Sequence, residues 1–439
     1  MAGRSATWAD DAKPSRVLLF GQADVRTYVE WEGSSVISSR APPLEISPST
    51  ARQRPIDPRP AFLLPWPQEP CAPCNTPATA VAPPLSRYHL LSDTLSCSLL
   101  CSLFSRLRFL WLQEIDPCSS EEAELSLYHV EIQVPSPKKD EVLLRVEAAS
   151  INPADWRVQK GMMRPFVPSK FPFVPVSDVA GEVVEVGPGV DGFKPGDKVV
   201  TWLGFKAGGL AEYVVAPVNI AVHIPPEVSA ADAAGLPIPA CSALQALRHA
   251  TTKFDGTGDP ANVLITAASG GVGTFAIQLA KLGNLHVTAT CGARNMELVR
   301  SLGADEVLDY KTPEGKSLKS PSGRKYDIVV HCTSSVGWSS LEPNLAAHGK
   351  VVDLNPSPGG FLRSALHQLT CSNKKLVVLI AMVNKEDLQF LVDLVKGGKL
   401  RTVIDSRYVL GKAEEAWAKS MEGHATGKII VERDQVMDI

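Results

Sequence analysis

The chain has 439 residues, 44% of them hydrophobic and 21% charged, a composition ordinary for a globular protein with room for two domains. A formal net charge of -3 at pH 7 provides no basic excess, so nucleic acid is not expected as a partner. Nine cysteines are scattered through a chain too long to need disulfides, which favours a reducing compartment. Cys71 and Cys74 form one close pair, without a second pair at zinc-ligand spacing.

Residues 1–110 differ in composition from the rest, being rich in proline and poor in glycine. No helical or strand period persists in them, so we expect a largely disordered extension, most proline-rich over Arg40–Pro84. Tyr88–Leu112 is leucine-rich, but Asp93, Arg106 and Arg108 interrupt it, which disfavours a spanning helix. A surface-lying helix and a wrongly assigned first exon remain as alternatives. Acidic residues near the amino terminus leave a targeting signal undecided.

A strand, a glycine turn and a helix follow one another directly in the stretch Val263–Leu282, VLITAASGGVGTFAIQLAKL. Three apolar residues open it, and apolar residues recur at helical spacing from Val272 onward. A helix that begins on Gly270, Gly271 and Gly273 presents unpaired backbone N–H groups to an anion, and a pyrophosphate is the expected ligand. The alternative is a close packing turn without ligand, since Ala267 replaces the first glycine of the usual motif.

A second strand, His286–Cys291, completes the βαβ unit that a dinucleotide requires. NAD-specific sites place a carboxylate at the end of this strand, yet Val287–Asn295 contains no Asp or Glu. Arg294 lies there instead and suits a 2′-phosphate, so the sequence predicts NADPH as cofactor. The alternative for Arg294 is a solvated residue capping a helix.

Alternating segments on either side of this unit predict the remaining sheets. The first group is expected to form a compact β barrel and covers Tyr128–Val134, Glu141–Ala148, Val179–Val186 and Lys198–Thr201. The second group is expected to extend a doubly wound parallel sheet and covers Glu306–Tyr310, Asp327–Cys332 and Lys350–Leu354.

Several motifs occur in the order of one family: NP-x-D, SDVAG-x-V-x-x-VG, FKPGD-x-V, LAEY and ASGGVG. In this the chain resembles the zinc-free quinone oxidoreductase branch of the medium-chain dehydrogenase/reductases. INPADWRVQKGMMRPF, LGADEVLDYKTPEG and GHATGKIIVE resemble its plant chloroplast-envelope members. The resemblance implies an α/β fold with a GroES-like β barrel and a Rossmann sheet. The expected division is a low-order extension (1–110), the first part of the catalytic domain (111–240), an NADPH-binding domain (241–375) and a return to the catalytic domain (376–439).

Zinc enzymes of this superfamily carry a cysteine in the first motif and Gly-His-Glu in the second. This chain has Asn152-Pro153-Ala154-Asp155 and Val176-Ser177-Asp178 at those places. We therefore expect no metal, and polarisation of the acceptor by hydrogen bonds. Asn152 is expected to cap the turn before Pro153.

The resemblance also implies contacts to the cofactor. Arg157 would face the nicotinamide as a cofactor or oxyanion contact, and its alternative is a surface arginine; Lys160 is a weaker candidate for the same region. His331 and Cys332 are expected to pack rather than to transfer protons. The implied cofactor-binding residues are Arg157, Gly270, Gly271, Val272, Gly273, Cys291, Gly292, Ala293, Arg294, Tyr310, Gly427 and Lys428.

The expected function is NADPH-dependent reduction of α,β-unsaturated carbonyls, with lipid-derived enones and γ-ketols as the preferred class. Quinone reduction is the alternative among enzymes, and a non-catalytic, membrane-associated NADPH-binding protein is the alternative from another class. By resemblance we expect the protein to be located at the chloroplast envelope, with the cytoplasm as the alternative. We also expect peripheral membrane association and a homodimer. The opening strand of the barrel has only Phe109–Asp116 as a candidate, and without it the barrel would have an unpaired edge.

Overall fold

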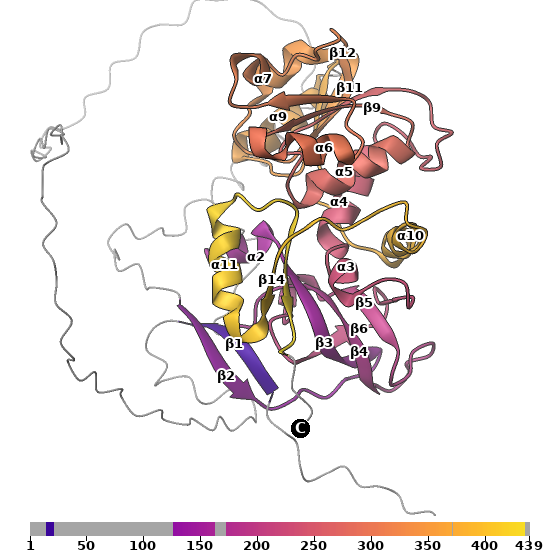
Figure 1. Cartoon of the computed structure of the whole chain (residues 1–439), viewed down its shortest axis with the longest axis vertical. Helices are drawn as coiled ribbons and strands as arrows, with labels where there is room; N and C mark the ends of the chain where they lie inside the picture. The colour runs from indigo at the N-terminus through magenta and orange to yellow at the C-terminus, as the bar shows by residue number, and fades with distance from the viewer. Residues whose placement is uncertain (1–14, 22–125, 163–172, 371, 435–439) are drawn as a thin grey trace, which may run out of the picture. The chain divides into compact units, whose positions relative to one another are not determined.

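The structure is a computed structural model that describes residues 15–21, 126–162, 173–370 and 372–434. Figure 1 shows its helices and strands. Tyr88–Leu112, Phe109–Asp116, Arg40–Pro84 and the Cys71–Cys74 pair lie outside these residues. The expected fold class is confirmed, because a parallel sheet and a second, mainly antiparallel sheet account for most of the described strands.

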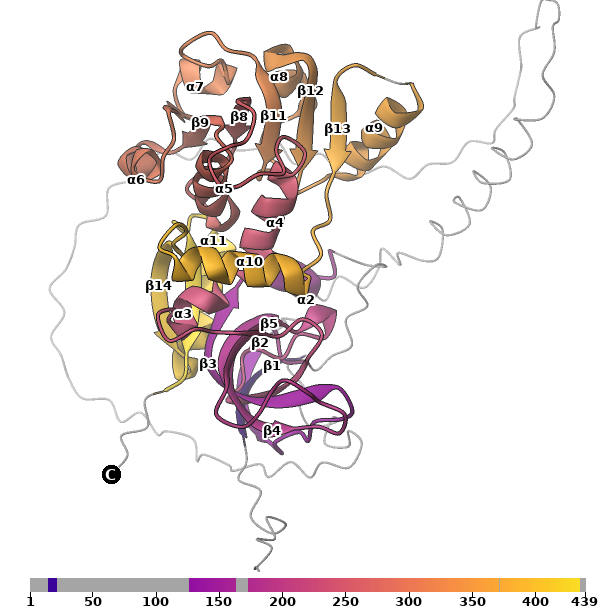
Figure 2. The same ribbon diagram turned by 90° about the vertical axis from the view of Figure 1, so that its right-hand side faces the viewer.

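The parallel sheet has six strands in the order β10-β9-β8-β11-β12-β13. This is the 3-2-1-4-5-6 order of a doubly wound dinucleotide-binding sheet, with its switch point between β8 and β11. Figure 2 shows β11, β12 and β13 side by side, with α9 next to β13. The strands are β8 (Asn262–Ile265), β9 (His286–Cys291), β10 (Glu306–Asp309), β11 (Tyr326–His331), β12 (Leu345–Asp353) and β13 (Lys375–Val378).

Helices cover this sheet because their apolar faces match its buried strands. Leu264, Ile265 and Phe275 are fully buried in the cores of the sheet, as the apolar runs predicted. The helices of this part are α4 (Pro237–Leu247), α5 (Gly271–Leu282), α6 (Met296–Ser301), α7 (Pro313–Ser317), α8 (Trp338–Leu341) and α9 (Pro358–Leu369). Helix α10 (Lys385–Lys396) instead contacts α4 and β7 (Val222–His223) of the second sheet. Two of the expected domain boundaries fall within elements: 240/241 lies inside α4, and 375/376 lies inside β13.

The second sheet has seven strands, ordered β14-β15-β3-β4-β5-β7, with β6 paired to β3. Segments far apart in sequence meet here, since β15 pairs antiparallel with the carboxyl end of β3. Figure 1 shows α11 beside β14. The elements are β3 (Glu141–Ile151), α2 (Pro153–Gln159), β4 (Asp178–Val186), β5 (Lys198–Trp202), β6 (Tyr213–Pro217), β7 (Val222–His223), α3 (Ala230–Ala234), β14 (Ile404–Val409), α11 (Ala413–Glu422) and β15 (Lys428–Glu432).

One segment of residues 1–110, which we expected to be largely disordered, forms regular structure. Ser15–Gly21 forms strand β1, which pairs antiparallel with β2 (Ser126–Ile132). Val17 lies opposite Val130, is 1% exposed and bridges to Ala211 of the barrel region. The strand that partners β2 therefore comes from the start of the chain, more than one hundred residues before β2, where no local sequence pattern connects the two.

Among the described residues, no helix combines the length and apolarity needed to cross a membrane.

Candidate active site

The amino end of α5 lies directly after β8, at the switch point of the parallel sheet. Gly270 is its N-cap residue, and no side chain caps the helix. By contrast, Asn384 caps α10 by accepting the N–H of Asp387. Because the first N–H groups of a helix have no partner within it, the uncapped turn of α5 can bind an anion. Gly270, Gly271, Val272 and Gly273 are thus brought together as the sequence predicted.

Two glycines near this turn are required by close backbone contacts. A Cβ on Gly273 would lie 2.6 Å from both the Ala267 carbonyl oxygen and the Ala268 Cα. Gly427 has φ +87°, and a Cβ there would lie 2.1 Å from the Val403 carbonyl oxygen. The Gly427 N–H donates to the Ser269 carbonyl at 2.9 Å. The carboxyl-terminal return therefore lies against the glycine turn, as the resemblance implied.

Lys428 follows Gly427, but its side chain is only 3% exposed and does not face solvent. Its Nζ donates to the Asn152 Oδ1 at 2.6 Å and to the Ile151 carbonyl at 3.1 Å. Its Cδ is 3.1 Å from the position that a Cβ on Gly271 would occupy. Lys428 thus touches the glycine turn through its methylenes and is anchored in the barrel through its ammonium.

Asn152 connects this lysine to two buried carboxylates. Its Nδ2 donates to the Asp178 Oδ2 at 2.8 Å, and its backbone N–H donates to the Asp155 Oδ2 at 2.7 Å. Asp178 Oδ2 also accepts the Ile238 N–H at 3.1 Å, at the start of α4. Asn152 is the N-cap residue of α2, as expected, but the capping bond comes from the Asp155 carboxylate, which accepts the Asn152 N–H, while the Asn152 side chain bonds to Lys428 and Asp178. The sequence did not predict that the motif would reach Lys428 and α4.

Burial shifts the pKa values of the three ionisable groups in this network, Asp155, Asp178 and Lys428. Burial raises the pKa of Asp155 to about 7 and that of Asp178 to about 6, and lowers the pKa of Lys428 to about 8. Each shift favours the neutral form, because a charge loses hydration inside the protein. The opposite charges of Lys428 and the two carboxylates act against these shifts. The network connects the glycine turn, α2 and α4, and the cofactor contact of Lys428 stays a prediction.

The residues expected around the 2′-phosphate divide into buried and exposed ones. Cys291 is 1% exposed, and burial raises the pKa of its thiol to about 11, so its side chain belongs to the core. Ala293 and Arg294 are exposed, and Gly292 is half-buried. Arg294 Nη2 donates to the His424 carbonyl at 2.5 Å. This places the guanidinium beside the GHATGK loop.

Tyr310 lies close to Gly292 and is 46% exposed. Its stacking against adenosine stays a prediction. One carboxylate was missed, since the parallel register places Asp309 beside Cys291. Its Oδ1 accepts the Lys311 N–H at 3.0 Å, so that oxygen is engaged within its own turn.

Arg157 projects from α2 and is half-buried. Its Nη1 donates to the Asn355 Oδ1 at 2.6 Å, and its guanidinium lies 5.3 Å from the centroid of the Trp156 ring. Lys160 lies 5.5 Å from the same ring. Asn355 comes two residues after β12, at the carboxyl-terminal edge of the parallel sheet. No sequence pattern could have identified this partner, which is 198 residues away.

His331 and Cys332 end β11 at the switch point and are held by Thr266. The Thr266 Oγ1 accepts the Cys332 N–H at 2.9 Å and lies 3.1 Å from the His331 Nδ1. Burial lowers the pKa of His331 and raises that of Cys332 to about 12. Both groups are therefore neutral near pH 7, and they have the packing role that we expected rather than one in proton transfer.

The two places where zinc relatives carry ligands are occupied by this hydrogen-bond network. Asn152 and Asp178 bond to each other, and Asn152 also accepts from Lys428. Within the part of the chain that the structure describes, no group of three or more His, Cys, Asp or Glu side chains is arranged to hold a metal ion.

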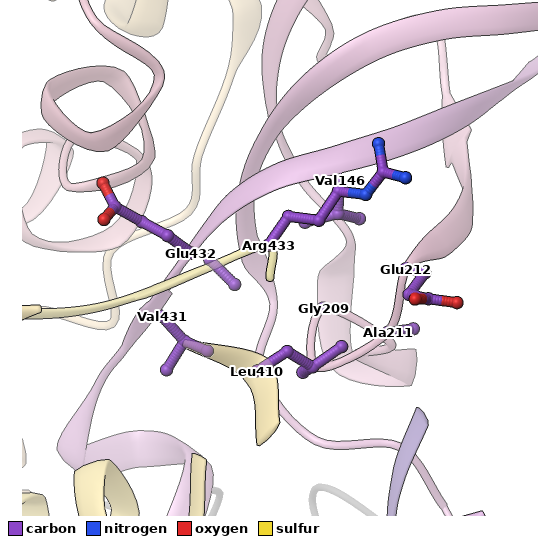
Figure 3. Close-up of a pocket in the computed structure, with 9 residues that line it drawn as sticks. Val146, Gly209, Ala211, Glu212, Leu410, Val431, Glu432 and Arg433 are labelled. Carbon is purple, nitrogen blue, oxygen red and sulfur yellow. The ribbon is translucent and has the colours of Figure 1, made fainter. Parts of the chain in front are cut away.

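A shallow pocket in the barrel region is separate from these residues (Figure 3). Val146 and Ala149 of β3, Leu410 and the chain from Val431 to Arg433 contribute to its lining. The lining includes none of the predicted cofactor contacts. The candidate site is therefore the region around the α5 turn and Arg157.

Comparison with known families agrees with this geometry. Residues 138–226 match the alcohol dehydrogenase GroES-like domain, and residues 302–431 match a family described as zinc-binding dehydrogenase. The chain is 60% identical over 308 residues to the chloroplast envelope quinone oxidoreductase homolog of Arabidopsis thaliana, covering 70% of this chain and 94% of that protein.

A second relative and a solved structure are more distant. The chain is 32% identical over 314 residues to the chloroplastic NADPH-dependent alkenal/one oxidoreductase of Arabidopsis thaliana, covering 68% of this chain and 74% of that protein. The structure of the quinone oxidoreductase from Coxiella burnetii matches with a TM-score of 0.63 and 29% identity, covering 70% of this chain and 94% of that one. Taken with the GroES-like and Rossmann parts, these likenesses show that the chain belongs to the medium-chain dehydrogenase/reductase family, in its quinone oxidoreductase branch, and is an oxidoreductase that uses a nicotinamide cofactor.

Proposed function

We propose that the chain is an NADPH-dependent reductase of α,β-unsaturated carbonyls that works without a metal. The observation that carries this proposal is the uncapped first turn of α5 at the switch point, between the carboxyl-terminal Gly427 loop and exposed Arg294. These residues fit a phosphorylated dinucleotide, because the turn offers backbone donors to the pyrophosphate and the guanidinium suits a 2′-phosphate.

The bound cofactor would supply a hydride. On the substrate, the hydride adds to the β carbon, the π electrons move to the carbonyl oxygen to give an enolate, and a proton from water completes the α carbon. Arg157 is the candidate donor to this oxygen, because charge develops there during the reaction. Gly270, Gly271, Val272 and Gly273 would bind the pyrophosphate through their backbone. Arg294 and Tyr310 would hold the adenosine end.

Two considerations favour NADPH and an enone. No Asp or Glu lies between Val287 and Asn295 to bind a free ribose 2′-hydroxyl, and a relative covering 68% of this chain is named an NADPH-dependent alkenal/one oxidoreductase. Quinone reduction is the second candidate function, because a 60% identical relative and a structural neighbour are both named quinone oxidoreductases. Lipid-derived enones and γ-ketols are the acceptors that we propose first.

An acceptor screen with purified, metal-depleted protein tests the proposal. NADPH oxidation is followed with lipid-derived enones, γ-ketols and quinones, and with the saturated ketone of each enone as a matched control. We expect turnover of the enones and none of their saturated counterparts. Turnover of quinones alone would replace the first candidate by the second, and turnover that requires added zinc would contradict both.

The chloroplast, and its envelope in particular, is the location that we propose from the names of the Arabidopsis relatives. Fractionation of plastids with an antibody against the protein tests this, and recovery in the cytosolic fraction alone would contradict it.

A further inference from the structure

Asn355 reaches the candidate site from a fixed position at the end of β12. Its backbone N–H donates to the Asp353 Oδ1 at 2.9 Å, which ties the residue to the strand before it. Its side-chain Oδ1 accepts from the Arg157 Nη1 at 2.6 Å. Arg157 belongs to α2, next to the barrel, so this bond joins the two parts of the fold at the candidate site.

Arg157 is a half-buried cation whose polar partner, the Asn355 amide, is neutral. In residues 15–21, 126–162, 173–370 and 372–434, no carboxylate forms an ion pair with it at 4.0 Å or less. Its guanidinium has five N–H donors, and Asn355 accepts from one nitrogen of the group. The Trp156 ring lies 5.3 Å from the guanidinium. Among the described residues, the positive charge is therefore held by a neutral acceptor and an aromatic ring, without a paired carboxylate.

We propose that Asn355 is a positioning residue: its amide oxygen orients the Arg157 guanidinium toward the substrate carbonyl without neutralising the charge. This inference rests on the proposed function, because it assigns Arg157 the role of donor to the developing oxyanion. An amide suits this task, whereas a carboxylate in the same place would orient the guanidinium and also pair with it. The cation would then stabilise a developing negative charge less.

Asn355→Asp separates this role from a merely structural one. If the bond only holds α2 against β12, a carboxylate should strengthen it and leave the activity unchanged. If Asn355 positions an uncompensated charge, the same substitution should lower kcat with the enone by about tenfold or more while thermal stability is kept. Asn355→Ala removes the acceptor, and we expect a similar loss of kcat because the guanidinium is no longer oriented.

The pH dependence provides a signature that packing does not produce. An introduced aspartate is neutral when protonated, so the kcat of Asn355→Asp relative to wild type should recover as the pH falls through the pKa of that carboxyl. Asn355→Ala should show no such recovery. The Kd for NADPH should change by less than about threefold in both variants, because the α5 turn holds the pyrophosphate.

Asn262→Asp is the matched control, because Asn262 Oδ1 also accepts from an arginine, Arg324, at 3.4 Å. Asn262 opens β8, at the opposite end of the parallel strands, so this variant should keep wild-type kcat. The experiment measures kcat, KM, Kd for NADPH and Tm for the full chain and the three variants. Wild-type kcat in Asn355→Asp, or equal pH profiles of the two Asn355 variants, would overturn the positioning role alone. Absence of any NADPH oxidation by the wild type would instead remove the proposed function and this inference with it.

Discussion

At the residue scale, the proposed preference for NADPH over NADH depends on Arg294. Arg294 follows the end of β9, its guanidinium is bonded to the His424 carbonyl of the GHATGK loop, and no carboxylate occupies residues 287–295. A charge-assisted contact to the 2′-phosphate would account for the proposed preference, since NADH lacks that group.

We predict that Arg294→Ala lowers the preference for NADPH over NADH by about tenfold, because one charge-assisted contact is lost. The Kd values of both cofactors, measured by calorimetry, provide the ratio. Arg300→Ala is the control, because Arg300 is also exposed and lies in the next helix, α6. An unchanged ratio in Arg294→Ala would show that another group recognises the phosphate.

Asp155 gives a second prediction, which concerns pH and stability. Its pKa is raised by burial from 3.8 to about 7, so the folded state holds more protons than the unfolded state between these values. The contribution of this carboxyl to the free energy of unfolding therefore falls as the pH rises from about 4 to about 7. Asp155→Asn removes this titration and can still accept from Asn152. The free energy of unfolding of the variant, relative to wild type, should rise by of order 1 kcal/mol or more across this window.

Denaturant unfolding at several pH values between about 4.5 and about 7.5 measures this difference. Burial lowers the pKa of Lys428 to about 8, so this lysine makes the free energy of unfolding rise with pH. It does so only above about pH 8, outside the range of the Asp155 effect. A difference between variant and wild type that stays constant, or that falls with rising pH, would contradict the raised pKa of Asp155.

At the scale of elements, the strand that pairs with β2 comes from a distant part of the sequence, the segment β1. It pairs with β2 along its whole length, and Val17 is buried against Ala211. The sequence offered only Phe109–Asp116 as a candidate for the opening strand, and that segment lies outside the described residues. The strand that pairs with β2 is Ser15–Gly21, which no local pattern connects to the barrel.

Val17→Asp should destabilise the protein by about 2 to 4 kcal/mol, because it places an unpaired carboxylate in a buried position. Thermal unfolding measures the effect as a fall in Tm. Glu131→Ala is the control, since Glu131 lies on β2 and is exposed, and it should change Tm little. If Val17→Asp unfolds like the wild type, β1 does not contribute to the folded unit.

At the scale of the whole molecule, local sequence patterns predicted individual strands and helices. They did not predict the long-range contacts between residues of the candidate site. The β8-turn-α5-β9 unit could be predicted because its glycines and apolar spacing are contiguous, and β9 has the predicted bounds. The partners of Arg157 and Lys428 could not, since they lie 198 and more than 270 residues away. Cys291 was expected among the residues around the 2′-phosphate, and the structure adds that its side chain, at the last position of β9, is buried in the core.

Helix α9 and strand β13 were not predicted, because neither has a contiguous periodic pattern in the sequence. Helix α9 begins with Pro358, Gly359 and Gly360, which read as a turn in the sequence, and the four residues of β13 are too few to show a period. They complete the parallel sheet next to β12. Asn355 lies in the loop between β12 and α9, so a site residue was hidden in a stretch without periodicity.

The destination of the transferred hydrogen tests the central claim most directly. The wild-type protein, depleted of metal, is incubated with NADPH deuterated at the transferable position and an enone, and the product is analysed by mass spectrometry and NMR. The account predicts one deuterium on the carbon β to the carbonyl and none on the carbonyl carbon. Deuterium on the carbonyl carbon would show alcohol formation and would contradict the account, as would a product without deuterium.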